Sequence, residues 1–327
     1  MTDIKKVALL RWDGKLGDTI MTCHFIRLLE ENDPSIEITV FSSSEIANEW
    51  IRKVSSKVKI INSQHRKFET PAFFKKYSKN FDVAFDSSES LRLKDMLALH
   101  YLNAKINIGY AMGNVFDINI PREFVNIKDR QEKAVSLLLG REVKHSKLPI
   151  PIFSNCFDFE KTSDFTVAFN FFGANKYRSF SFESAIKLIE DWLLEWPDEY
   201  VILIPVPGQM EYLSKLEKTL SNKRVFLPKE NPGLDLTLSI LSVCDLCFTP
   251  DTSVVHMASV LNTPTLAVYR DAMFKYRAWK PLADNSRTVF YKDMVNEVDR
   301  GYVDSFNWSE LVSMKNEITD SLHNKKI

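Results

Sequence analysis

Residues 248–259, with the sequence FTPDTSVVHMAS, combine side chains and a spacing that could hold an anion. Asp251, Thr252 and Ser253 favour the start of a helix, and the residues that follow are predicted to continue it. The first turn of a helix presents free backbone N–H groups and the positive end of the helix dipole, which together bind phosphate or pyrophosphate. His256 is expected near this turn and could face the same anion. An ordinary capped helix is the alternative interpretation.

A second loop, residues 11–18 (RWDGKLGD), could supply a base. Gly17 would let the backbone turn tightly or approach a ligand. Asp18 could cap the helix that follows, or it could point into a cleft and accept a proton from an incoming hydroxyl group. The loop contains neither G-x-G-x-x-G nor the lysine motif of ATP-binding loops. A dinucleotide-binding fold and phosphoryl transfer from ATP are therefore disfavoured.

A third loop, residues 172–180 (FGANKYRSF), places two cations and an amide after an apolar run. Asn175, Lys176 and Arg178 could together neutralise a leaving diphosphate. The alternative is a solvated loop with ordinary basic residues.

The elements that must position these loops alternate along the chain, which predicts an α/β fold with mostly parallel sheets and helices on both faces. Strands are expected at residues 6–10, 36–41, 58–61, 81–86, 106–109, 165–169, 200–204, 225–227, 241–248 and 265–269. Helices are expected at residues 19–31, 91–101, 182–194 and 254–261.

The pattern is interrupted at residues 149–164, where two prolines and a polar stretch indicate a linker. Two α/β domains of similar size are predicted, residues 1–155 and 156–327, and a chain of this length can give each its own core. The loops at 11–18 and 248–256 follow predicted strands, and open parallel sheets bind ligands at the carboxyl ends of their strands. Two facing domains would place the site in the cleft between them.

The charge is balanced overall but uneven along the chain. A formal net charge of zero gives no signature of a polyanion partner, so no nucleic acid is expected. Between residues 51 and 110, twelve lysines and arginines stand against five acids. This stretch could be an ordinary solvated face, or it could dock on an acidic lipid or an acidic glycan.

The cysteines and the apolar runs bear on the compartment. Cys23, Cys156, Cys244 and Cys247 are all expected to be buried thiols in a reducing compartment. The sequence has no signal-peptide pattern and no apolar run of membrane-spanning length. A cytoplasmic protein that at most rests on a membrane surface is therefore expected.

Taken in order, these motifs resemble those of a known family. R-x-D-x-x-G-D leads into a helix, a G-A-N loop with basic residues follows, and P-D-T-S-x-x-H-M-A comes later. This arrangement resembles glycosyltransferase family nine, the ADP-heptose:lipopolysaccharide heptosyltransferases. Residues 81–90, 104–110 and 279–282 support the resemblance, which therefore covers most of the chain. It implies the GT-B fold, with two Rossmann-like doubly wound domains facing a central cleft.

The resemblance also implies roles for individual residues. In the first domain, Asp18 matches the general base, and the acceptor-binding residues are expected to be Asp13, Lys15, Gly17 and Arg92. In the second domain, the donor-binding residues are expected to be Asn175, Lys176, Arg178, Gln209, Glu211, Asp251, Thr252, Ser253 and His256. Within that set, Lys176 or Arg178 would face the phosphates, and Gln209 or Glu211 would contact the ribose. No metal ligand and no cofactor are implied.

The sequence departs from the family at three positions near the donor site. Ser253 stands where the family has glycine, so its side chain would either crowd the phosphate or add a hydroxyl to its binding. Residues 178–181 (RSFS) lack the tryptophan and proline of the family's turn, and residues 205–208 (PVPG) replace a glycine-rich turn. These departures leave the base and the sugar of the donor open.

The predicted activity is the transfer of a heptose from ADP-heptose to the inner core of lipopolysaccharide, with inversion and without a metal. The basic stretch between residues 51 and 110 would contact the phosphorylated acceptor or the membrane surface. Two alternatives stay open: another nucleotide-sugar enzyme of the same fold, such as an epimerase, and a non-catalytic member that binds glycans.

Overall fold

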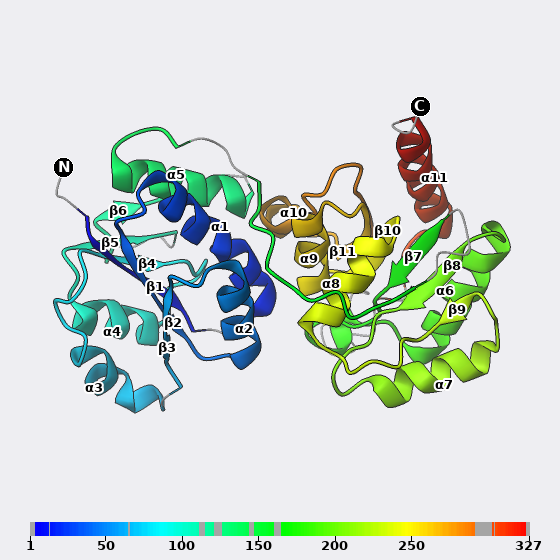
Figure 1. Cartoon of the computed structure of the whole chain (residues 1–327), viewed down its shortest axis with the longest axis horizontal. Coiled ribbons are helices and arrows are strands. Elements are labelled where there is room, and N and C mark those ends of the chain that lie inside the picture. The colour runs from blue at the N-terminus through cyan, green and yellow to red at the C-terminus, as the bar shows by residue number, and fades with distance from the viewer. Residues whose placement is uncertain are drawn as a thin grey trace. The chain divides into compact units, whose positions relative to one another are not determined.

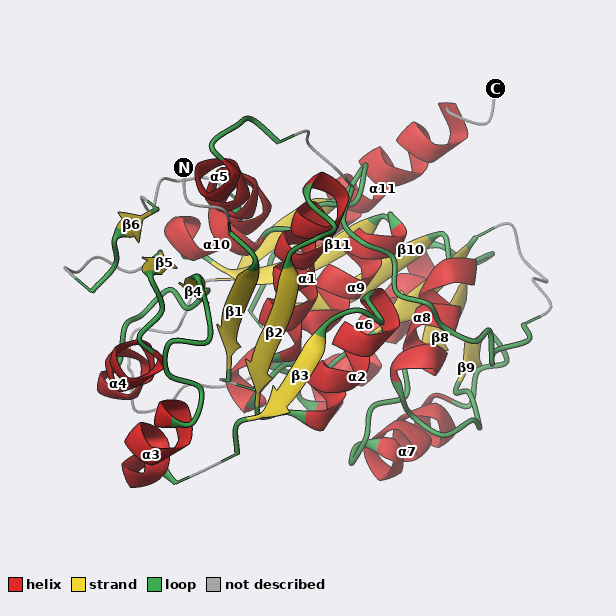
Figure 2. Cartoon of the chain, turned by 60° about the vertical axis from the view of Figure 1, so that its left-hand side comes forward, coloured by secondary structure: helices red, strands yellow, loops and turns green. Residues whose placement is uncertain are grey.

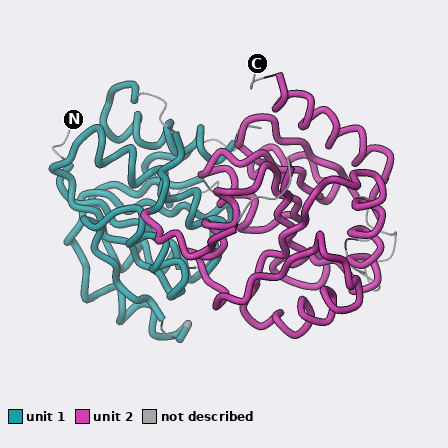
Figure 3. The backbone as a smooth tube through the Cα atoms, turned by 45° about the vertical axis from the view of Figure 1, so that its right-hand side comes forward, with its two compact units in different colours: residues 1–151 teal, residues 152–327 magenta. Residues whose placement is uncertain are grey.

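The computed structural model describes residues 4–12, 14–64, 66–110, 115–120, 126–143, 147–159, 165–291, 303 and 305–324. The chain divides into two compact units, Met1–Pro151 and Ile152–Ile327 (Figure 3). The polar stretch that the sequence marks as a linker begins where the first unit ends.

The first unit is built on a parallel six-stranded sheet with the strand order β3-β2-β1-β4-β5-β6 (Figure 1). Its strands are β1 (Lys6–Arg11), β2 (Glu37–Ser42), β3 (Lys59–Asn62), β4 (Val83–Asp86), β5 (Ile106–Gly109) and β6 (Ile118–Asn119). The chain proceeds from β1 to β3 on one side and then returns beside β1 to form β4. This reversal makes the sheet doubly wound and leaves the ends of β1 and β4 side by side.

Helices cover both faces of this sheet. They are α1 (Leu16–Asn32), α2 (Glu45–Val54), α3 (Thr70–Lys75), which follows the short η1 (Lys67–Glu69), α4 (Leu93–Leu102) and α5 (Ile127–Leu139). Helix α1 packs against α2 and α5, whereas α3 packs against α4. Figure 2 shows α3 and α4 on one side of the strands and α1 and α2 on the other.

The second unit repeats the design with the strand order β12-β11-β10-β7-β8-β9, again all parallel. Its strands are β7 (Thr166–Phe169), β8 (Tyr200–Leu203), β9 (Val225–Phe226), β10 (Leu246–Pro250), β11 (Thr265–Arg270) and β12 (Arg287–Tyr291). Its helices are η2 (Lys176–Arg178), α6 (Phe182–Glu195), α7 (Met210–Leu220), α8 (Leu234–Val243), α9 (Ser253–Leu261), α10 (Met273–Trp279) and α11 (Trp308–Asn324). The predicted class, α/β with two doubly wound domains, is confirmed.

One expected strand is wrong in part. The apolar run 241–248 was expected to form a single strand, but residues 241–243 end helix α8 and β10 begins only at Leu246. Helix α8 is buried over most of its length, so its apolar residues show no clear helical period. A short apolar run of this kind cannot be divided between helix and strand by its pattern alone.

The cysteines differ in one case from expectation. Cys23, Cys244 and Cys247 are buried, as expected, but Cys156 is exposed. Cys156 precedes β7 in the polar stretch that follows the first unit, where its backbone N–H donates to Ser239 Oγ at 3.2 Å. Hydrophobicity alone favoured burial for this thiol, but a connecting segment runs over the surface.

Candidate functional site

In the first unit, the ends of β1 and β4 and the start of α1 are held together by Arg11. Its side chain is 2% exposed. Arg11 Nη1 donates to Ser87 Oγ at 3.2 Å, and Arg11 Nη2 donates to Asp18 Oδ2 at 2.9 Å. Ser87 follows β4, the neighbour of β1 in the sheet. The guanidinium therefore fixes Asp18 at the carboxyl edge of the sheet.

Asp18 lies inside the first turn of α1, which begins at Leu16. Its side chain is 19% exposed, and its Oδ2 atom lies 3.6 Å from Lys15 Nζ as well as 2.9 Å from Arg11 Nη2. Two cations and the positive end of the helix dipole therefore stabilise the carboxylate. A partly exposed, oriented carboxylate of this kind can accept a proton from a hydroxyl group that reaches it.

The other acceptor-side residues have different settings. Gly17 lies within α1, so the sharp turn before the helix is made instead by Gly14, whose φ of +74° is in the left-handed region. Of the two roles expected for Gly17, the tight turn is wrong, and the approach to a ligand stays a prediction. Gly14, three residues earlier, was the available signal for the turn. Asp13 lies outside the described residues. Arg92 precedes α4, and its Nε donates to the buried carboxylate of Asp95 at 2.9 Å.

Asp86, at the end of β4, lies opposite Leu10 of β1 and therefore next to the region that Arg11 holds together; the sequence did not single it out. It is fully buried, and its Oδ1 accepts the backbone N–H of Ser88 at 2.9 Å. Burial raises the pKa of Asp86 to about 6; nearby Asp95 also raises it, and Arg11 lowers it. The D-x-x-x-D-x-x-x-S pattern at residues 82–90 contains Asp86 and was the available signal.

In the second unit, the structure brings two expected donor-site residues into contact. Arg178 ends η2, and Asp251 directly follows β10. Arg178 Nη1 lies 3.2 Å from Asp251 Oδ2, and both side chains are partly exposed. Strands β7 and β10 are neighbours, so the loops that follow them meet at one carboxyl edge. A cation and a carboxylate thus stand together beside the start of α9.

The loop that carries Arg178 has a defined shape because of Gly173. A Cβ atom on Gly173 would lie 2.3 Å from the carbonyl oxygen of Arg178, so only glycine fits. Ser179 Oγ accepts the N–H of Gly173 at 3.1 Å and donates to the carbonyl of Asn175 at 2.8 Å. Lys176 is exposed, and its Nζ lies 5.1 Å from the centre of the Tyr177 ring. The G-A-N motif contained Gly173, although its role depends on this close packing.

Helix α9 begins as expected after a polar joint. Thr252 is its N-cap residue with an extended backbone, and Ser253 is its first residue. Within the described residues, the Thr252 side chain makes no capping hydrogen bond. The partly exposed Thr252 and Ser253 therefore lie at a helix N-terminus that an anion could approach.

His256 is buried in α9 against Trp279, with 5.8 Å between the ring centres. Burial lowers the pKa of His256 to about 4, so the ring is neutral near pH 7. Any interaction with an anion would therefore use a neutral N–H donor. Gln209 precedes α7 and Glu211 lies in its first turn, at the edge where β8 ends. Their expected contact with the ribose stays a prediction.

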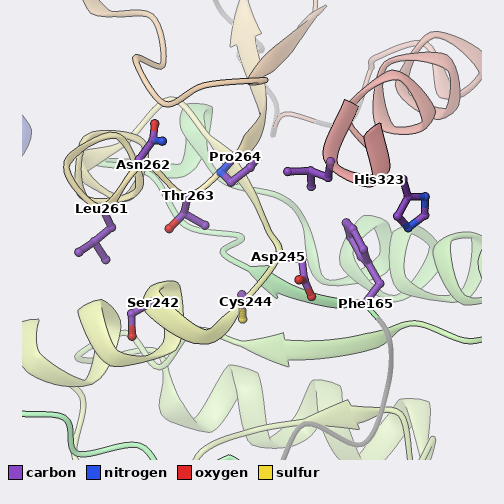
Figure 4. A pocket seen from close by; sticks show the side chains of 10 residues that line it. Phe165, Ser242, Cys244, Asp245, Leu261, Asn262, Thr263, Pro264 and His323 are labelled. Carbon is purple, nitrogen blue, oxygen red and sulfur yellow. The ribbon is translucent and has the colours of Figure 1, made fainter. Parts of the chain in front are cut away.

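A pocket of about 260 Å³ lies at the opposite, amino edge of the second sheet (Figure 4). Phe165, Asp245 and Pro264 line it just before β7, β10 and β11, and His323 of α11 contributes from the side. None of the expected donor residues lines this pocket. The pocket is therefore separate from the candidate donor site.

Two further properties concern metals and membranes. Among the described residues, no group of three or more His, Cys, Asp or Glu side chains is arranged to hold a metal ion. In the same part of the chain, no helix has both the length and the apolar character needed to cross a bilayer.

Solved structures share the fold over nearly the whole chain. The glycosyl transferase family 9 structure from Veillonella parvula DSM 2008 has a TM-score of 0.68 and 13% identity, covering 97% of this chain and 98% of its own. E. coli ADP-heptose lps heptosyltransferase II has a TM-score of 0.67 and 15% identity, covering 99% and 100%. E. coli heptosyltransferase WaaC with ADP has a TM-score of 0.65 and 13% identity, covering 96% and 99%. Among curated proteins, none matches the chain.

The shared architecture places the chain in the GT-B class, with two doubly wound sheets in one polypeptide. The model of the family described as "Glycosyltransferase family 9 (heptosyltransferase)" matches residues 210–307. This match confirms the family resemblance predicted from the sequence, and the protein is a glycosyltransferase. The matched segment includes α9 and Asp251 but not the loop that carries Asp18.

Proposed function

We propose that the protein transfers a heptose from ADP-heptose to a sugar hydroxyl of the lipopolysaccharide inner core. The observation that carries this proposal is the carboxylate of Asp18, which Arg11 holds partly exposed at the carboxyl edge of the first sheet. The family match of the second unit and the heptosyltransferases with the same fold supply the class of donor and acceptor.

In the proposed reaction, Asp18 accepts the proton of the acceptor hydroxyl as its oxygen attacks the anomeric carbon. The new C–O bond forms on the face opposite the diphosphate, the bond from the anomeric carbon to the diphosphate oxygen breaks, and ADP leaves. Inversion follows from this single displacement. Positioned general bases contribute roughly 10²- to 10⁴-fold to the rates of such steps.

The charge that develops on the departing diphosphate would be stabilised by the start of α9 together with Lys176 and Arg178. Backbone N–H groups at a helix N-terminus and basic side chains can do this without a metal ion. Arg178 pairs with Asp251 in the present structure. A bound diphosphate would therefore either share Arg178 with Asp251 or replace Asp251 as the partner of Arg178.

The nucleotide can be identified by a thermal-shift series with ADP, UDP, GDP and CMP. A ligand that binds only the native state raises the melting temperature by an amount that grows with its concentration relative to Kd. We expect ADP to give the largest shift. Because the departures near Ser253 leave the base open, a larger shift with UDP or GDP would replace ADP-heptose with another donor and leave the transferase class intact.

Transfer itself is tested by ADP release from ADP-heptose with and without a heptose-free inner-core acceptor. The expected result is release that depends on the acceptor, with the heptose recovered on the acceptor. Epimer or free sugar formed without acceptor would instead indicate an epimerase-like enzyme. Acceptor binding without nucleotide release from any donor would indicate a non-catalytic glycan-binding protein. We place the reaction in the cytoplasm, at the inner membrane that carries the acceptor.

A further inference from the structure

Helix α4 exposes an apolar stripe where a solvated helix would expose polar residues. Leu93 and Met96 lie three residues apart on the helix, where they are 73% and 40% exposed, and the partly exposed Leu97 lies beside Met96 in the sequence. The opposite stripe is buried and includes Ala98 and Leu99. The buried stripe is enough to pack α4 against its unit. That packing therefore does not explain why apolar residues also stand on the exposed side.

The neighbouring segment, η1 with α3, has a similar exposed side. Phe68 is 74% exposed, and Ala72, Lys75 and Lys76 are exposed at helical spacing from it. Helix α3 packs against α4 on the same face of the first sheet (Figure 2). The exposed residues of η1, α3 and α4 therefore lie on neighbouring elements, and we call them together the α3–α4 surface.

The charges around the α3–α4 surface are mostly positive. Exposed cations border it, namely Arg66, Lys75, Lys76, Lys79 and Arg92. Among the described residues of η1, α3 and α4, the acids are Glu69, which is exposed, and Asp95, which is fully buried. Because Asp95 pairs with Arg92, the excess of exposed positive charge comes chiefly from the arginine and lysines of residues 66–79.

We propose that the α3–α4 surface binds an anionic lipid bilayer. Phe68, Leu93 and Met96 would enter the boundary between headgroups and acyl chains, and Lys75 and Lys76 would contact lipid phosphates. Exposed apolar side chains flanked by lysine and arginine are the combination that interfacial helices use, and each basic residue adds attraction to an anionic surface. An acidic glycan would use the cations but would give the exposed Phe68 and Leu93 no apolar environment.

This inference can be tested without donor or acceptor. The whole chain would be sedimented with phosphatidylcholine vesicles and with vesicles that also contain phosphatidylglycerol. We expect binding only to the anionic vesicles, and weaker binding as salt is raised, because salt screens exposed charges. Absence of binding to anionic vesicles at low salt would overturn the proposal.

The apolar contribution is tested with Phe68→Glu and Leu93→Glu. Both side chains are exposed, so the substitutions leave the core intact, and circular dichroism and melting temperature would verify this. The matched control is Leu194→Glu, because Leu194 is 83% exposed on α6 of the second unit. Each test variant should bind vesicles at least about tenfold more weakly, since each loses an apolar side chain that would be buried in the bilayer. The control should bind as the wild type does. Equal effects of test and control variants would contradict the proposal.

The electrostatic contribution is tested by Lys75→Glu with Lys76→Glu, compared with Lys218→Glu and Lys223→Glu in the second unit, where both lysines are also exposed. The first pair should abolish the preference for anionic vesicles and the second should not. Acceptor-dependent ADP release in detergent should be unchanged by any of these variants. If the first pair left vesicle binding intact but lost activity in detergent, the surface would serve the acceptor glycan and the lipid proposal would be wrong.

Discussion

Arg11 and Asp18 form an ion pair, with 2.9 Å between Nη2 and Oδ2, that joins the last residue of β1 to the first turn of α1. The arginine is buried and the carboxylate is partly exposed. One partner is thus built into the unit, and the other presents its charge where a substrate could reach it. This division is suited to a base whose direction must be fixed.

Asp18→Asn should retain the shape of the side chain and lose the base. We expect kcat for transfer to fall by about 10²- to 10⁴-fold, with little change in the Kd for ADP, because the expected donor residues all lie in the other unit. Steady-state rates and nucleotide titration would measure both quantities. Asp191→Asn is a suitable control, since Asp191 pairs with Lys187 on the surface of α6. Normal turnover in the Asp18 variant would remove this residue from the mechanism.

Arg11→Gln should impair the same step indirectly, because the glutamine cannot supply the charge beside Asp18. Loss of an adjacent cation makes a carboxyl group harder to ionise, so the rising limb of the pH–rate profile should move to higher pH. Arg11→Lys should restore the position of that limb in part.

Loss of the buried hydrogen bonds of Arg11 should also lower the free energy of unfolding by about 1–3 kcal/mol. A purely structural role for Arg11 would produce this loss of stability in both variants without any shift in the pH–rate profile. Measuring denaturant unfolding and the profile on the same samples separates the two cases.

Asp86→Asn should change how stability depends on pH. The folded-state pKa of Asp86 is about 6 against an ordinary value of 3.8, so folding favours the protonated form. The contribution of Asp86 to the stability of the wild type should therefore fall as pH rises from about 4 to about 6, by up to roughly 3 kcal/mol, whereas the asparagine variant cannot ionise. Through that interval the free energy of unfolding of the variant should rise relative to that of the wild type. Any destabilisation by the amide itself does not depend on pH and leaves this trend unchanged. Parallel stability curves, measured by urea unfolding from pH 4 to pH 7, would show that burial does not perturb Asp86 in this way.

Arg178→Gln should separate nucleotide binding from stability. The Arg178–Asp251 pair is partly exposed, so its loss should change the free energy of unfolding by at most about 1 kcal/mol. ADP binding should weaken much more, because a charge-assisted contact to the diphosphate is lost. Lys176→Gln is the informative comparison, since Lys176 is exposed in the same loop. The variant with the larger loss of ADP affinity identifies the residue that contacts the phosphates. If both variants bound ADP as tightly as the wild type does, there would be no diphosphate site at this loop.

The sequence alone indicated the repeating strand–helix order, because buried parallel strands are short apolar runs separated by polar loops. Each expected strand has a counterpart in the structure, including β1, β4, β7 and β10, whose following loops carry the candidate residues. The sequence analysis did not predict strands β6 and β12 or helices α2, α3, α5, α7, α8, α10 and α11. In α2 and α7 the apolar residues lie on one buried face, so their spacing was an available signal.

The sequence also supplied the motifs that contain Asp18, Arg178 and Asp251, because these depend on residue type and local spacing. Tertiary structure decided which of them meet. Arg178 and Asp251 are 73 residues apart in the sequence, and they form a pair because β10 lies beside β7 in the sheet, although β8 and β9 separate these two strands along the chain. Arg11 likewise reaches Ser87 because β4 returns to the side of β1. Strand order is set by how whole elements bury their apolar faces together, and no single segment of sequence contains that information.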